Sequence, residues 1–184
     1  MIFDSIPLTA WSSFLAVLFL VSGGLNLLAV DRAAALAKSF PRSKACDWIL
    51  SAIAFLWAAA LVYSLPFDFL VKIRVYVVLL IIISIPLSWY FMPDLLGSRA
   101  IGGLLVLLPA PILQIARFND SSWRYVVIVL MYVFAILGMV LILNPYHLRD
   151  ALSWMAAKKS RMTAVGGASA VLGLLLLLLA LFAF

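Results

Sequence analysis

The sequence has little of what most catalytic and metal sites are built from: it contains one histidine, one cysteine and no glutamate. The lone Cys46 excludes an internal disulfide and a metal site built from several cysteines of one chain. Only 11% of the residues are charged, and no aspartate lies in the middle of a long apolar run. Because ion and proton pathways use carboxylates or histidines within the membrane, coupled ion transport is disfavoured.

What the chain has in abundance is apolar residues, which make up 67% of its 184 positions. Soluble domains are about half apolar and about a quarter charged, so this composition indicates an integral membrane protein. The net charge of +6 comes from basic residues in short segments between the apolar runs. Anionic lipid head groups are therefore the expected counter-charge, and nucleic acid is not.

The apolar runs predict an all-α bundle, because an open strand in lipid would leave its backbone groups unpaired. About 20 residues are needed to cross the hydrocarbon layer. Runs of about this size are Leu8 to Val30, Cys46 to Ser64, Phe69 to Phe91, Ala100 to Ala116, Trp123 to Leu143 and Met162 to Phe184. The N-terminus has no basic region and no cleavage signal, so the first run is expected to stay in the mature protein.

The run from Ala100 to Ala116 contains Pro109 and Pro111, which favour a kink or break. A re-entrant hairpin is the alternative to a full span. With six spans, the loops on one side hold nine Lys and Arg residues and those on the other side hold four. This bias favours six spans with both termini outside, in a membrane that we expect to be a bacterial inner membrane.

Short similarities along the chain predict one membrane domain, 1–184, made of three helical hairpins at 8–64, 69–116 and 123–184. Residues 97–103 read GSRAIGG and residues 160–167 read SRMTAVGG, and a proline precedes each stretch. Such short apolar matches also arise by chance, so repetition and coincidence both remain open.

The segment Asn144 to Gly167 carries the only histidine, His147. Asn144 and Pro145 suit a helix start, and Leu148, Leu152 and nearby apolar residues recur at helical spacing, which predicts a surface helix. The alternative is catalysis, with His147 as general base and Asp150 as the group that orients it. No nucleophile motif completes such a site, so we predict no catalytic, cofactor or metal residues.

Residues 31–48 are expected to form a matching surface helix on the same side, with a solvated loop as the alternative. The two segments then present basic side chains to the head groups, where each attracts anionic lipid. The predicted lipid-contact residues are Arg32, Lys38, Arg42, Lys44, His147, Arg149, Lys158, Lys159 and Arg161.

Small residues within the spans predict where helices approach closely, because burial of apolar surface does not drive association in lipid. The predicted helix-packing residues are Gly23, Gly24, Gly102, Gly103, Gly166, Ala170 and Gly173. The alternative is that glycine is simply frequent in membrane helices.

The segment from Gly138 to Phe184 resembles a family of small two-helix bacterial inner-membrane proteins of uncharacterised function. The shared features are Gly138, Pro145, an amphipathic linker, then Arg161, Gly166 and Gly173. The stretch SRAIGG at 98–103 is similar to that of small four-helix membrane proteins related to the DoxX group. These resemblances imply a membrane hairpin and bring no catalytic residues.

Three functions are compatible with the sequence. The first is a non-enzymatic structural or accessory subunit with a basic cytoplasmic face, bound to other membrane subunits or to copies of itself. The second is a small transporter or permeation subunit for a neutral or lipid-like solute, with its site near Pro109 and Pro111. The third is an enzyme that acts on lipid head groups through His147 and Arg149.

Overall fold

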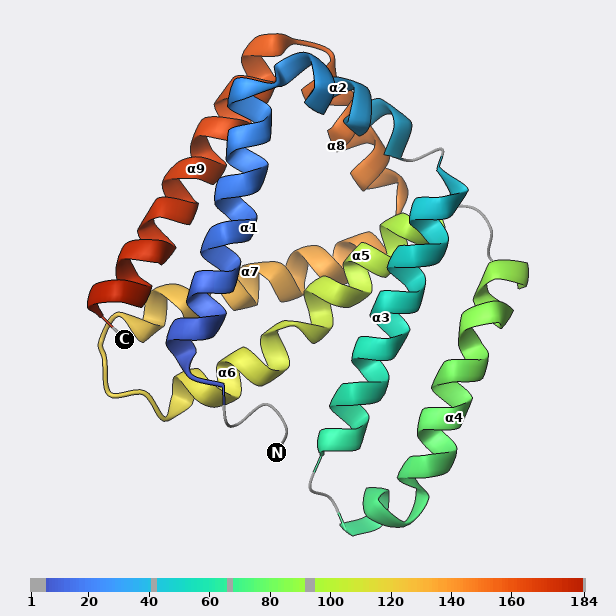
Figure 1. The fold of residues 1–184 in the computed structure, drawn as a ribbon. Helices are drawn as coiled ribbons and strands as arrows, with labels where there is room; N and C mark the ends of the chain where they lie inside the picture. Colours follow the sequence, from blue (N-terminus) through green and yellow to red (C-terminus); the bar gives the residue numbers. More distant parts are fainter. Residues whose placement is uncertain (1–5, 41–42, 66–67, 92–94, 184) are drawn as a thin grey trace.

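The computed structural model describes residues 6–40, 43–65, 68–91 and 95–183, and these residues are helical throughout, apart from short connections (Figure 1). Long helices make up the bundle, and two short ones, α2 and α8, cross one of its ends. In chain order the helices are α1 (Leu8–Leu28), α2 (Val30–Ser39), α3 (Lys44–Ser64), α4 (Asp68–Phe91), α5 (Leu96–Leu107), α6 (Pro109–Arg117), α7 (Arg124–Leu143), α8 (Tyr146–Ala156) and α9 (Lys159–Phe182).

Within the described part of the chain, six segments are long and apolar enough to cross a membrane, which confirms the predicted fold class. The fourth of them, Leu96–Arg117, combines α5 and α6. A slight bend separates the two at Leu108, because Pro109 and Pro111 lack the N–H groups that would continue the helical bonding. Both helices run on in the same direction (Figure 1), so the chain does not turn back at the prolines.

The first and last spans, α1 and α9, lie side by side and antiparallel. A Cβ on Gly23 would lie 2.7 Å from the backbone nitrogen of Ala170 and 2.8 Å from the carbonyl oxygen of Gly166. A Cβ on Gly173 would lie 2.9 Å from Leu20. These glycines therefore allow the two backbones to approach more closely than any other residue would permit.

The pairing of α1 with α9 differs from the hairpin arrangement expected from the sequence, in which α1 would pack on α3 and α7 on α9. In the described chain, α3 instead packs against α4 and α5. The physical reason is that apolar helix faces look alike in lipid, so close approach at glycine selects partners irrespective of distance along the chain.

A second close antiparallel pair consists of α5 and α7. A Cβ on Gly138 would lie 2.6 Å from the carbonyl oxygen of Gly102, and one on Gly102 would lie 2.9 Å from that of Gly138. The α6–α7 connection is held by Arg124, whose guanidinium donates to the carbonyl oxygens of Arg117 and Asn119. The first carbonyl belongs to the last residue of α6 and the second lies just after the helix, where a cation is favourable.

The hairpin of α3 and α4 is fastened at both ends. At one end the indole N–H of Trp89 donates to the hydroxyl oxygen of Ser51 at 2.8 Å, and the ring of Trp89 stacks on Trp48. At the other end Arg74 donates to the carbonyl oxygen of Tyr63 and lies over its ring. Away from these two fastened ends, the exposed side chains of α4 are mostly apolar, as expected for a helix that faces lipid.

The buried core lies where α1, α6, α7 and α9 meet, toward the end of the bundle opposite α2 and α8. Leu15, Ile112, Met131 and Leu176 are almost completely buried there. Much of the remaining helix surface is apolar and exposed, which is the pattern of a bundle whose outside faces lipid.

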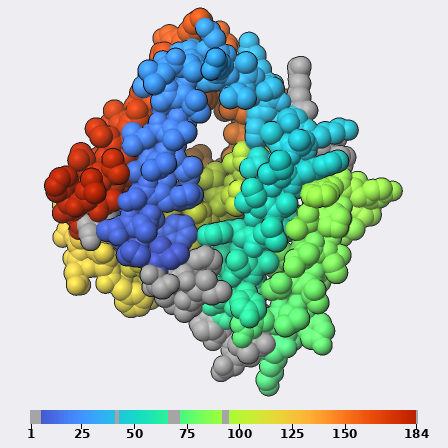
Figure 2. Space-filling view, in the orientation of Figure 1, coloured from blue at the N-terminus to red at the C-terminus, as the bar shows by residue number. Residues whose placement is uncertain are grey.

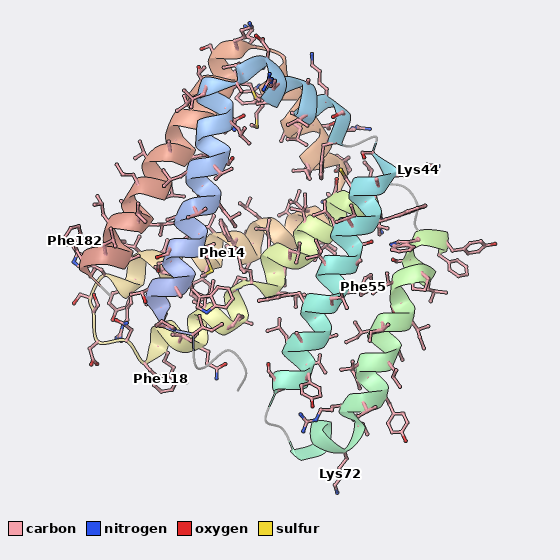
Figure 3. All side chains as sticks on the ribbon, in the orientation of Figure 1. Phe14, Lys44, Phe55, Lys72, Phe118 and Phe182 are labelled. Atoms are coloured by element: carbon pink, nitrogen blue, oxygen red, sulfur yellow. The ribbon has the colours of Figure 1, made fainter. Side chains whose placement is uncertain are left out.

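Basic residues gather at the end of the bundle that α2 and α8 cover. Figure 3 labels Lys44 at this end and Lys72 at the opposite end. The described basic residues at the covered end are Arg32, Lys38, Lys44, Arg99, Arg149, Lys158, Lys159 and Arg161, and those at the other end are Lys72, Arg74, Arg117 and Arg124. That the covered end faces the cytoplasm, with both termini outside, stays a prediction.

Candidate functional site

The surface helices α2 and α8 pack against each other and form a roof over the space between α1 and α3 (Figure 1). Each is amphipathic, and the apolar faces of both helices point down into this space. The residues on these faces are Ala33, Leu36 and Ala37 of α2 and Leu148, Leu152 and Met155 of α8. Part of the apolar surface that the sequence assigns to the membrane surface thus faces this open space, although only Ala33 among these residues is buried.

An ion pair and a cation–aromatic contact hold the roof to the last span. The ammonium group of Lys159 lies 2.7 Å from the carboxylate of Asp31, which joins the start of α9 to the start of α2. The guanidinium of Arg161 lies 4.3 Å from the centre of the Trp154 ring and donates to the Trp154 carbonyl oxygen. Both contacts are solvent-exposed, so each contributes modestly to stability.

Directly beneath the roof is a cavity of about 820 Å³. Its remaining lining includes polar side chains from α1, from the end of α2 and from the start of α3 with the residue before it, namely Ser22, Asn26, Ser39, Ser43 and Cys46. Farther from the roof, between α1, α3 and α5, a second cavity of about 570 Å³ has an apolar lining. It is formed by Ile6, Ala10, Trp11, Phe14, Leu18, Ile53, Trp57, Ile101, Leu104, Leu105 and Leu108.

The two cavities adjoin, since Leu18 and Ile101 line both of them. We call the combined space the chamber. The rings of Trp11 and Trp57 meet edge to face at its lower end, with centroids 6.1 Å apart. Figure 2 shows the molecule hollowed between α1 (blue) and α3 (cyan), so the chamber opens sideways between these two spans. Each of the two cavities lies within the size range of small-molecule sites, and the chamber as a whole is larger than that range.

No aspartate, lysine, arginine or histidine belongs to the described lining of the chamber. The basic residues of this end stand outside it, and most are exposed. A ligand inside the chamber therefore meets mostly apolar surface, with a few neutral hydrogen-bonding groups near the roof.

The predicted lipid-contact residues lie around the roof. Exposed positions are taken by Arg32 and Lys38 on α2, Lys44 at the start of α3, and His147, Arg149, Lys158 and Lys159 in and after α8, while Arg161 is half-buried. Arg42 falls outside the described residues. Contact of these side chains with head groups stays a prediction.

His147 and Asp150 are not joined in the described structure. The carboxylate of Asp150 accepts from Arg149, with the guanidinium nitrogen Nη2 at 3.0 Å. The His147 ring lies beside that of Tyr146, at 4.4 Å between centroids. The helix begins at Tyr146, one residue later than expected, and the Asn144 side chain makes no cap there. The geometry gives the proposed base no orienting carboxylate.

The predicted packing glycines fall into two groups. Gly23, Gly102, Gly166 and Gly173 lie at close helix contacts, and the backbone of Ala170 lies against Gly23. Gly24 and Gly103 have open space where a Cβ would stand, because each lies one residue, or about 100° around the helix, away from its contact face. Gly138, which the glycine pattern did not single out, makes one of the closest approaches of all.

Sequence reasoning also missed the buried carboxylate of Asp47, in the first turn of α3. Its oxygen Oδ1 accepts the backbone N–H of Gly97 at 2.9 Å. Gly97 lies in the first turn of α5, just after Leu95, whose φ of 56° is left-handed. An aspartate near a helix start gives no sequence signal for a partner fifty residues away, so only the packing shows this contact.

Pro109 and Pro111 are buried and do not line the chamber, but the adjacent Leu108 does. Among the described residues, no group of three or more His, Cys, Asp or Glu side chains is placed to hold a metal ion. The absence of catalytic, cofactor and metal residues stays a prediction from the sequence.

No protein-family model, curated protein or solved structure matches this chain. The resemblances of Gly138 to Phe184 and of residues 98–103 to small bacterial membrane proteins therefore rest on those residues alone.

Proposed function

We propose that this polytopic membrane protein is a binding and permeation subunit for a lipid-like solute, which occupies the chamber. The observation that carries the proposal is a mostly apolar chamber that has a few neutral polar side chains only beneath the roof and that opens between the spans α1 and α3. Small-molecule sites commonly combine an apolar wall with a few placed polar groups. Of the three functions that the sequence allows, the chamber favours this one.

Filling the passage between the two cavities tests the proposal. Leu18 lines both cavities and is half-exposed, so Leu18→Trp places an indole where the solute would pass. Val17 is the matched control, because it is equally exposed on α1 but lines neither cavity. Each protein is reconstituted into vesicles, and uptake and transbilayer exchange of a fluorescent lipid are measured.

We expect Leu18→Trp to reduce the protein-dependent exchange rate severalfold and Val17→Trp to leave it within the error of the wild-type rate. Thermal unfolding in detergent checks that both variants are folded. Equal exchange by all three proteins, or no exchange above protein-free vesicles, contradicts permeation through the chamber.

A second candidate is an accessory subunit, which we propose from the outer face of α4. Over Lys72–Phe91 no described side chain of this helix is buried, and α4 packs chiefly against α3. Leu80 and Leu87 lie exposed on it. Affinity purification in mild detergent tests this role: a partner should be lost with Leu80→Ala and Leu87→Ala and retained with Leu137→Ala on α7. A protein that runs alone and monomeric argues against it.

A further inference from the structure

The chamber is mostly apolar along its whole length, and its few polar side chains are confined to the end beneath the roof, which is the distribution of polar groups along an amphiphile. On α1 its lining extends from Ala10 to Asn26, which is about 24 Å at 1.5 Å per residue. One leaflet contributes only about 15 Å of the roughly 30 Å hydrocarbon layer. A ligand that fills the chamber is therefore long, with a tail that reaches past the middle of the bilayer toward Trp11 and Trp57.

The polar end offers hydrogen bonds and no charge. Asn26 uses one N–H for the carbonyl oxygen of Ser22 at 2.9 Å, which leaves its oxygen Oδ1 to accept and a second N–H to donate. Ser43 accepts from the backbone N–H of Cys46, and its own hydroxyl hydrogen remains able to donate. A group that both donates and accepts, such as a hydroxyl, suits these partners.

A charged head group does not suit them. Burying an ion without a counter-ion costs several kcal/mol, and no charged side chain belongs to the described lining. A phosphate or carboxylate would find its cations outside the roof instead, at exposed residues such as Lys38 and Lys44. Lys38 lies on the roof helix α2 and Lys44 begins α3 directly after Ser43, but neither belongs to the described lining of the chamber.

We propose that the chamber's ligand is an uncharged long-chain lipid alcohol, with its hydroxyl group among Ser22, Asn26 and Ser43 and its tail against Trp11 and Trp57. The alcohol would enter from the bilayer through the opening between α1 and α3, because both of these helices are candidate membrane spans. This inference rests on the proposed function and names the solute class for it.

Fluorescence quenching in nanodiscs tests the assignment. The full-length protein is placed in unlabelled phosphatidylcholine and titrated with a long-chain alcohol that carries bromine atoms on its tail. We expect saturable quenching that unlabelled oleyl alcohol reverses and that oleate, of the same length but charged, does not. The saturable component should disappear in the variant Trp11→Phe with Trp57→Phe, because these rings line the lower cavity.

The head-group end is tested separately with Ser22→Ala and Asn26→Leu. Loss of one neutral hydrogen bond, about 1 kcal/mol, should weaken alcohol binding about fivefold in each. Binding of a brominated alkane without a hydroxyl should not change. Ser22→Ala is decisive if Asn26→Leu disturbs folding, because Asn26 also contacts Gly166.

The outcomes separate the two proposals. If oleate competes as well as the alcohol, the head-group assignment is overturned while lipid binding in the chamber stands. If quenching rises linearly without saturation in every protein, the chamber holds bulk lipid tails only, and both proposals fail. Unchanged alcohol affinity in Ser22→Ala and Asn26→Leu also overturns the placement of the hydroxyl group.

Discussion

Asp47 of α3 caps the start of α5 across the bundle, because its carboxylate accepts the N–H of Gly97 at 2.9 Å. The first N–H groups of a helix have no partner within it, and the helix start attracts negative charge. The contact is close: a Cβ on Gly97 would overlap Oδ1 of Asp47. One side chain thus fixes the junction of two spans on which the chamber's walls depend.

We expect Asp47→Ala to destabilise the protein by about 1–2 kcal/mol, the cost of losing a helix cap. For a chain of this length each kcal/mol corresponds to about 2–4 °C in Tm. Asp47→Asn keeps an oxygen acceptor and should lie much closer to the wild type. Thermal unfolding in detergent, followed by size-exclusion chromatography, measures both. Equal Tm values for Asp47→Ala and the wild type would refute the cross-bundle cap.

Substitution by alanine should change the stability of the protein in opposite directions at two adjacent glycines. Gly23→Ala, Gly102→Ala and Gly166→Ala force a Cβ to within about 3 Å of a neighbouring helix, and overpacking of this kind costs about 1–3 kcal/mol. The controls Gly24→Ala, Gly103→Ala and Gly167→Ala enter open space and should gain up to about 1 kcal/mol from helix propensity. Tm values of the three pairs measure this, and a pair whose members shift alike would count against the corresponding helix contact.

The bond from Trp89 to Ser51 should hold α4 on α3. Trp89→Phe keeps an aromatic ring beside Trp48 but loses the 2.8 Å hydrogen bond, for an expected cost of about 1 kcal/mol. Trp89→Ala removes the stacked ring as well and should cost distinctly more. Limited proteolysis of the α3–α4 connection reports loosening of the hairpin. Protection that is the same in all three proteins would show that this contact does not fasten α4.

The exposed ion pair of the roof should matter little for stability. Asp31→Asn removes the partner of Lys159, and exposed pairs contribute about 0.2–1 kcal/mol. Arg161→Gln should cost more, because it removes both the contact with the Trp154 ring and the bond to its carbonyl oxygen. The Tm of each variant in low and in high salt tests which substitution costs more. Only the loss of Tm caused by Asp31→Asn should vanish in high salt.

Cysteine labelling can test the orientation. Cys46→Ala gives a cysteine-free protein, since the chain has one cysteine. We expect Lys158→Cys, at the covered end, to react with a membrane-impermeant maleimide only after cells are opened, and Arg117→Cys to react in intact cells. The reverse pattern would place the covered end outside.

The number of spans and the surface helix after Pro145 could be predicted because each depends on a local property. The other surface segment is expected at 31–48 as a helix or a loop, whereas the helix α2 ends at Ser39 and Lys44 to Trp48 belong to the span α3. A run of about 20 apolar residues must be helical in lipid, and the spacing of Leu148 and Leu152 indicates an amphipathic helix in any environment. The packing role of Gly23 could be predicted from residue type, whereas its neighbour Gly24 faces open space. Which of two adjacent glycines contacts a neighbouring helix depends on how the helix is rotated about its own axis. The glycines themselves do not set that rotation.

The sequence by itself determined that this chain is an α-helical membrane protein with six candidate spans, short surface helices and basic residues concentrated in particular loops. Only the tertiary structure decided that α1 pairs with α9, that Asp47 reaches Gly97, and that the roof's apolar faces cover a chamber. The physical reason is that every span is apolar on all sides, so composition cannot distinguish a lipid-facing side chain from one that lines a cavity. Close contacts at a few small or polar residues decide which face of each span packs against another helix and which faces lipid.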